Sequence, residues 1–173
     1  MEPFDQLIAA NRAYVDAGSH HPLPVRPARS LVIVTCMDSR IDAFATLGLQ
    51  LGEAHVVRVA GARVTDDVLR SLTLSTHVLG TRAVAVIGHT DCGLVDPEGT
   101  LVERLTTLMG RPPVEREWGT FVTADDAVRE DCARLGAWSD RPDDLAIAGY
   151  VLDVTTGALQ ERVPPWEPGP ART

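Results

Sequence analysis

The sequence predicts a single α/β domain built on a mostly parallel β-sheet, and three observations support this fold class. Short, nearly all-apolar runs, such as LVIVT at 31–35 and AVAVIG at 83–88, are typical of strands buried on both faces of a sheet. Helical segments with one apolar face alternate with these runs, which favours parallel crossover connections. The chain has 173 residues, 45% of them hydrophobic, enough for one domain core.

The chain divides into an arm, a domain and a tail. Residues 1–30 are predicted to form an N-terminal helix over 3–16 and a Pro-rich arm, because the prolines that follow cannot continue a helix. Residues 31–163 are predicted to form the α/β domain, which carries the candidate ligand motifs described below. Residues 164–173 are predicted as a Pro-rich tail that is poorly ordered or lies on a neighbouring surface.

Within the domain, Thr65 is the expected N-cap and Gly80 the expected C-cap of one helix, since these residue types favour those positions. A turn at Thr156 and Gly157 joins two antiparallel strands. After the strand at 31–35, the expected elements follow in this order: a strand at 54–61, a helix at 65–80, a strand at 83–88, a helix near 101–109, a surface connection at 110–119, a helix at 123–136 and the paired strands of 146–163.

Composition narrows the classes of partner. The formal net charge is -8, and every basic side chain other than histidine is arginine, so a nucleic-acid surface is not expected. No apolar run reaches the length of a membrane span and the N-terminus lacks a signal-peptide pattern, so we expect a cytoplasmic protein without membrane contact. Three cysteines without a secretory signal do not indicate a disulfide framework.

Two polar clusters, CMDSR at 36–40 and HTDCG at 89–93, each directly follow an apolar strand. Ligands of open parallel sheets bind beyond the carboxyl ends of the strands, so the clusters are expected to converge. They offer Cys36, Asp38, His89 and Cys92, a ligand set suited to tetrahedral zinc. A bidentate pair with Arg40 would hold Asp38 off the metal and leave the fourth position for water.

These motifs resemble the β-class carbonic anhydrases, in particular the compact prokaryotic branch. The similarity rests on CMDSRID, GEAHVVRVAG, VTDDVLRSL and GTRAVAVIGHTDCG, which extend over most of residues 30–95. The resemblance implies zinc held by Cys36, His89 and Cys92, and a catalytic pair of Asp38 and Arg40. It also implies four parallel strands with a fifth antiparallel edge strand, and a homodimer with its active sites near the interface.

The activity implied by the resemblance is reversible hydration of carbon dioxide to bicarbonate by zinc-bound hydroxide, with Asp38 assisting and Arg40 keeping it ionised. One alternative is hydrolysis of carbon disulfide or a related heterocumulene on the same centre. A second is a non-catalytic, zinc-stabilised dimeric module in which Asp38 closes the site as a fourth ligand. Two positions depart from the family pattern: Val59 replaces the usual Asn, and Ile33 replaces the Trp of bicarbonate-inhibited members.

The remaining metal-binding residue types are expected to have no catalytic role. Cys132 lies on the apolar face of its helix, which predicts core packing. Asp91 is expected to be a solvated carboxylate or to contact residues around the metal, and is not expected to bind the metal itself. The other histidines lack partner spacing and are expected to be structural, for His55 and His77, or solvated, for His20 and His21.

Overall fold

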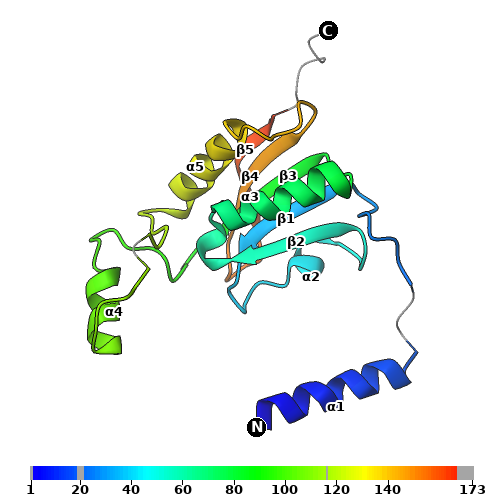
Figure 1. The fold of residues 1–173 in the computed structure, drawn as a ribbon, viewed down its shortest axis with the longest axis horizontal. Coiled ribbons are helices and arrows are strands. Elements are labelled where there is room, and N and C mark those ends of the chain that lie inside the picture. The colour runs from blue at the N-terminus through cyan, green and yellow to red at the C-terminus, as the bar shows by residue number, and fades with distance from the viewer. Residues whose placement is uncertain (1, 19–21, 116, 167–173) are drawn as a thin grey trace.

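The computed structural model describes residues 2–18, 22–115 and 117–166, and its centre is one five-stranded sheet (Figure 1). The strand order is β2-β1-β3-β4-β5, with parallel pairing among the first four strands and antiparallel pairing of β4 with β5. This confirms the predicted fold class. The strands are β1 Leu31–Cys36, β2 Ala54–Val59, β3 Ala83–His89, β4 Ala146–Leu152 and β5 Leu159–Trp166.

Burial along the strands follows their place in the sheet. The central strands β1, β3 and β4 consist mainly of Val, Ile and Ala and are largely buried, whereas the edge strands β2 and β5 are partly exposed. Strands covered on both faces need apolar side chains at successive positions, which is the pattern of their sequences. The sheet is therefore held by two apolar clusters, one centred on Val34 and Val86 and the other on Ile33 and Ile87.

The described residues form five α-helices besides the sheet, and two of them pack against its first cluster: α3 through Val68 and Leu72, and α5 through Val128 and Leu135. The helix α5 is capped by Thr123, whose side chain accepts a hydrogen bond from the backbone N–H of Asp126. The helices are α1 Glu2–Asp16, α2 Ala43–Leu47, α3 Asp66–Thr73, α4 Leu101–Met109 and α5 Ala124–Gly136.

Several local boundaries differ from the prediction. The helix expected to reach Gly80 ends as α3 at Thr73 and continues as a π-helical turn, Leu74–Val78. Thr65 is its N-cap but makes no side-chain capping bond. The strand expected to reach 61 ends at Val59, followed by a 3-10 turn over Ala60–Ala62.

The short helix α2 was not predicted, and its boundaries follow from local chemistry. The Asp42 carboxylate accepts hydrogen bonds from the N–H groups of Phe44 and Ala45 at its start. Gly48 ends it at a φ of 62°, a left-handed conformation that glycine adopts without steric cost.

Strand β5 runs through Trp166 and so takes in three residues of the predicted tail. The remaining tail, 167–173, lies outside the described residues, as do His20 and His21.

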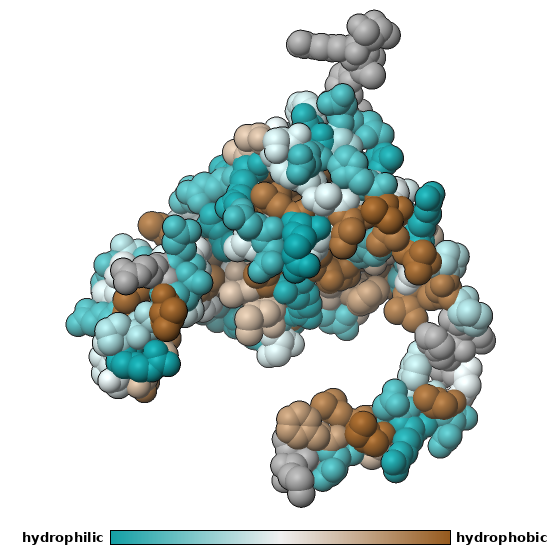
Figure 2. All heavy atoms as spheres, in the orientation of Figure 1, coloured by the Kyte–Doolittle hydropathy of each residue, from teal (hydrophilic) through white to brown (hydrophobic). Residues whose placement is uncertain are grey.

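Two helices stand away from the sheet. Figure 1 places α1 and α4 apart from the layers around the strands, and Figure 2 shows apolar side chains on the surface of α1. Phe4, Leu7 and Ile8 of α1 are all more than half exposed, and α4 has no buried residue. Within the described ranges, no helix is both long and apolar enough to cross a membrane.

Helix α5 packs directly against two glycine positions of the sheet. A Cβ on Gly88 would lie 2.8 Å from Val128 Cγ2, and one on Gly149 would lie 2.6 Å from Val128 Cγ1 and 2.8 Å from Cys132 Sγ. Real Cβ atoms do not approach other atoms so closely, so a side chain at either position would force the helix outward. The close packing of α5 thus depends on Gly88 and Gly149.

Replacement of Gly149 by alanine is expected to destabilise the fold by about 1–3 kcal/mol, because the added methyl group overpacks the contact with Val128 and Cys132. The matched control is Gly136→Ala in α5, where a Cβ would have no neighbouring atom within 4 Å. Urea unfolding measures both. A Gly149→Ala variant as stable as Gly136→Ala would contradict the packing argument.

Candidate metal centre

Three metal-binding side chains converge where β1 and β3 end. The two strands are adjacent and parallel, and Thr35 pairs with Ile87, so Cys36 at the end of β1 lies beside His89 at the end of β3. Cys92 follows His89 in a turn. One ligand atom from each of Cys36, His89 and Cys92 lies within 4.8 Å of the other two, and all three residues are buried. The predicted convergence of the two clusters is therefore observed.

The ring of His89 is oriented for binding a cation. Its Nδ1 lies 2.8 Å from the carbonyl oxygen of Thr90, which can only accept, so Nδ1 carries the proton and donates. Its Nε2 is buried and has no hydrogen-bond partner among the described residues. An unpaired buried nitrogen is costly, and a metal ion would satisfy its lone pair.

The two thiols complete a donor set with one nitrogen and two sulfurs. Burial raises the pKa of the Cys92 thiol, and the neighbouring Cys36 raises it further. A cation between the sulfurs favours their thiolate forms, and two thiolates with one imidazole are a common ligand set of zinc. The residues present thus fit a zinc ion by chemistry, by burial and by the unpaired nitrogen of His89.

Arg40 lies between two carboxylates beside this cluster. Its Nε donates to Asp38 Oδ1 at 3.0 Å and its Nη2 to Asp38 Oδ2 at 2.7 Å, the bidentate pair expected from the sequence. Its Nη1 donates to Asp91 Oδ2 at 2.6 Å, so Asp91 contacts Arg40 and not the ligand cluster directly. The hydrogen bonds from Arg40 hold the pKa of Asp38 far below its usual range. Asp38 is therefore ionised at neutral pH.

Arg58 fixes the loop that carries Asp38. Its guanidinium donates to the backbone carbonyls of Cys36, Asp38 and Ile41. Three carbonyls of one loop are satisfied by one side chain because guanidinium donors spread in a fixed fork. The sequence did not predict this role for Arg58. Its position between valines near the end of β2 was the available signal.

A second buried contact involves Arg63, which follows the turn after β2. The Arg63 Nε lies 3.1 Å from Asp131 Oδ2, and the other oxygen of Asp131 accepts from the Val64 N–H at 3.0 Å. Burial raises the pKa of Asp131, whereas the charge of Arg63 opposes that shift. The pair ties α5 to the turn after β2. Neither residue was predicted from the sequence, because the contact joins segments 68 positions apart, a separation that no local pattern reports.

Cys36 and Cys92 open onto a pocket of about 260 Å³ with a largely apolar wall formed by Met37, Ala60 and Leu94. Gly61 lies on this wall at a φ of 66°, and a Cβ there would come within 2.8 Å of Leu94. Val59, which replaces the family asparagine, packs against the core cluster that contains Val34 and does not line the pocket. The pocket is small and mainly apolar, with Asp38 as its charged group.

The other predicted residues lie away from the centre. Cys132 is buried in the core under α5, as predicted. His55 contacts Ser75 Oγ through its Nδ1 at 2.8 Å, and His77 contacts the carbonyl oxygen of Asp140 through its Nε2 at 2.7 Å, which supports their structural roles.

Comparisons with known proteins agree with this geometry. The carbonic anhydrase family model matches residues 31–110. β-Carbonic anhydrase 1 of Mycobacterium tuberculosis is 36% identical over 162 residues, covering 92% of this chain and 98% of the relative. The carbon disulfide hydrolase of Acidianus sp. is 32% identical over 157 residues, covering 77% of each chain. The crystal structure of carbonic anhydrase from Streptococcus mutans superposes with a TM-score of 0.87 at 42% identity, covering 93% of this chain and 98% of that one.

Truncation of Asp131 to alanine is expected to cost on the order of 3 kcal/mol of unfolding free energy, because it removes the buried partner of Arg63 and the acceptor of the Val64 N–H. Glu130→Ala is the matched control, since Glu130 pairs with the same guanidinium but its side chain is 65% exposed against 4% for Asp131. The control should lose less than about 1 kcal/mol. Equal losses in urea unfolding would show that burial does not set the strength of the Arg63 contacts.

Proposed function

Because the chain belongs to the β-carbonic anhydrase family, we propose that it catalyses the zinc-dependent, reversible hydration of carbon dioxide to bicarbonate. The observation that carries this proposal is the bidentate hold of Arg40 on Asp38 beside the cluster of Cys36, His89 and Cys92. A purely structural zinc site gains nothing from a cation that occupies its nearest carboxylate.

In this proposal Cys36, His89 and Cys92 hold the zinc ion. When bound, zinc supplies a Lewis acid that lowers the pKa of a water to about 7 and so provides a nucleophile near neutral pH. The hydrogen bond from His89 Nδ1 to Thr90 keeps the ring in the required tautomer.

Asp38 is the proposed hydrogen-bond acceptor that orients the attacking water. Its Oδ2 lies 3.9 Å from His89 Nε2, at the edge of the ligand cluster, and its lowered pKa keeps it ionised throughout the neutral range. It can therefore accept a hydrogen bond from the attacking water and orient it. Arg40 is the proposed positioning residue, because both oxygens of Asp38 are held by its fork. Asp91 in turn limits the rotation of that fork.

The apolar wall of Met37, Ala60 and Leu94 supports a small substrate without charge. Carbon dioxide has this chemistry, and so does carbon disulfide, the substrate in the names of several relatives. Carbon disulfide hydrolysis on the same centre is therefore the second candidate. The third, a non-catalytic module closed by Asp38, is less favoured because Arg40 already occupies both carboxylate oxygens.

A homodimer and a cytoplasmic location stay predictions. The exposed apolar side chains of α1, including Phe4 and Leu7, support association with a second copy, because an amphipathic helix gains stability when its apolar face is buried.

Stopped-flow measurement with a pH indicator tests the activity. The zinc-loaded protein is expected to accelerate carbon dioxide hydration, and the same preparation is offered carbon disulfide while hydrogen sulfide release is followed. Hydrogen sulfide release without carbon dioxide hydration would select the second candidate. A fully zinc-loaded protein with neither activity would leave the non-catalytic module.

Zinc content tests the ligand assignment. One zinc ion per chain should copurify with the protein, and Cys92→Ser should lose most of it because a hydroxyl is a poor replacement for a thiolate. Cys132→Ala, which removes the third buried cysteine, should keep its zinc. Full zinc occupancy of Cys92→Ser in plasma emission measurements would reject the assignment.

Substitution of Arg40 separates positioning from metal binding. Arg40→Ala should keep its zinc, since no proposed ligand changes, while hydration falls by a factor on the order of 10² because Asp38 is no longer oriented. Arg40→Lys should hydrate carbon dioxide little faster than Arg40→Ala, because an ammonium group cannot form the bidentate contact with Asp38. Arg70→Ala, which removes an exposed pair with Asp67, is the control. An unchanged rate in Arg40→Ala would remove Asp38 and Arg40 from the mechanism.

A further inference from the structure

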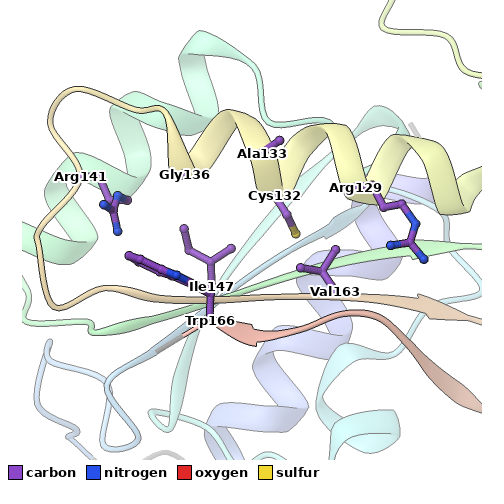
Figure 3. A pocket seen from close by; sticks show the side chains of 8 residues that line it. All are labelled: Arg129, Cys132, Ala133, Gly136, Arg141, Ile147, Val163 and Trp166. Carbon is purple, nitrogen blue, oxygen red and sulfur yellow. The ribbon is translucent and has the colours of Figure 1, made fainter. Parts of the chain in front are cut away.

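A second pocket, of about 440 Å³, lies between the C-terminal half of α5 and the edge of the sheet formed by β4 and β5 (Figure 3). Its volume is within the range of small-molecule sites. None of the residues that line the metal centre lines it. Its walls include Cys132 and Ala133 from α5, Ile147 and Val163 from the strands, and Trp166 at the end of β5.

The hollow follows from small side chains and an irregular edge strand. Ala133 and Gly136 lie on α5 above the pocket and leave the sheet uncovered there. Opposite them, Gly149 pairs with Val163 and Ile147 pairs with Trp166, so Pro164 and Pro165 together span one residue of β4. Prolines lack the N–H that a regular ladder needs, and such bulges bend an edge strand. Trp166, which follows the bend, forms one wall of the pocket.

Two arginines flank this apolar floor. Figure 3 shows Arg141 beside Trp166 at one end of the pocket and Arg129 at the other. The Arg141 guanidinium lies over the Trp166 ring, 4.6 Å from its centroid. Its Nη1 is buried and has no hydrogen-bond partner within the described residues.

Among the described residues, neither guanidinium group has a carboxylate partner. Neither Arg129 nor Arg141 forms an ion pair in the part of the chain that the structure describes, whereas Arg134 on the same helix pairs with Asp66. A buried guanidinium nitrogen without an acceptor is costly, and an anion is the partner that satisfies it best. In a chain of net charge -8, these two cations form a local anion site.

We propose that this pocket binds a small organic carboxylate with an apolar body. The carboxylate accepts hydrogen bonds from Arg141, and the body covers the side chains of Ile147, Val163 and Cys132. An inorganic anion would leave the apolar floor exposed, and a neutral apolar molecule would leave the Arg141 nitrogen unpaired. Binding is reversible and non-covalent, since burial raises the pKa of the Cys132 thiol to about 12 and keeps it protonated.

Calorimetric titration of the full-length, zinc-loaded protein tests the site. The probes are 4-phenylbutyrate and its uncharged analogue 4-phenylbutanamide, which differ in the group that would contact Arg141. We expect one binding site for the acid and at least about tenfold weaker binding of the amide, the factor expected for loss of a charged hydrogen bond. Equal binding of the two probes, or no binding of the acid at 10 mM, would overturn the proposal.

Variants locate the bound probe. Arg141→Gln should weaken binding of the acid at least about tenfold, because it removes the guanidinium that the carboxylate would contact. Arg134→Gln removes a guanidinium of the same helix outside the pocket and is the control. Far-UV circular dichroism verifies the fold of each variant. Undiminished binding in Arg141→Gln would place the acid elsewhere, for instance at the zinc, and would exclude the pocket.

Discussion

The parallel pairing of β1 with β3 is the constraint on which the metal centre depends. The ligands come from two segments of the chain more than fifty residues apart, and only the alignment of Thr35 with Ile87 makes both segments end at the same edge. The turn to Cys92 passes through Asp91 at a φ of 53°, a conformation uncommon for residues other than glycine. A slip of one residue would turn Cys36 to the opposite face of the sheet.

Arginine side chains hold the loops at this edge of the sheet in place around the ligand cluster. Arg40, Arg58 and Arg63 each connect a loop at the carboxyl edge to a second segment through two or more contacts. The chain contains no lysine, so each of these cations has a planar fork. Arg40 and Arg58 therefore hold the loop that carries Asp38 by hydrogen bonds of defined direction, which suits a site in which the orientation of one carboxylate matters.

The sequence predicted the elements whose signal is local. Apolar runs predicted the central strands, and the helix expected at 123–136 is observed as α5, because burial and helical periodicity depend on neighbouring residues. The helix α2 has too few residues for a periodic signal, and the π-helical turn keeps the apolar pattern of the helix before it. Strand β5 extends through prolines that read as a tail. The ligand motifs were visible, whereas the pairing of Arg63 with Asp131 is tertiary and left no pattern.

The packing of α5 against two glycines limits the order in which substitutions can accumulate in this sequence during evolution. Val128 lies against both glycine positions, with one methyl group facing Gly88 and the other facing Gly149. Enlarging either glycine first would meet a filled space, whereas a smaller residue at 128 opens room at both positions at once. Substitutions here are therefore expected in a fixed order, with Val128 on the helix changing before either glycine on the strands. Which residues can be accepted at positions 88 and 149 thus depends on what has already happened at position 128.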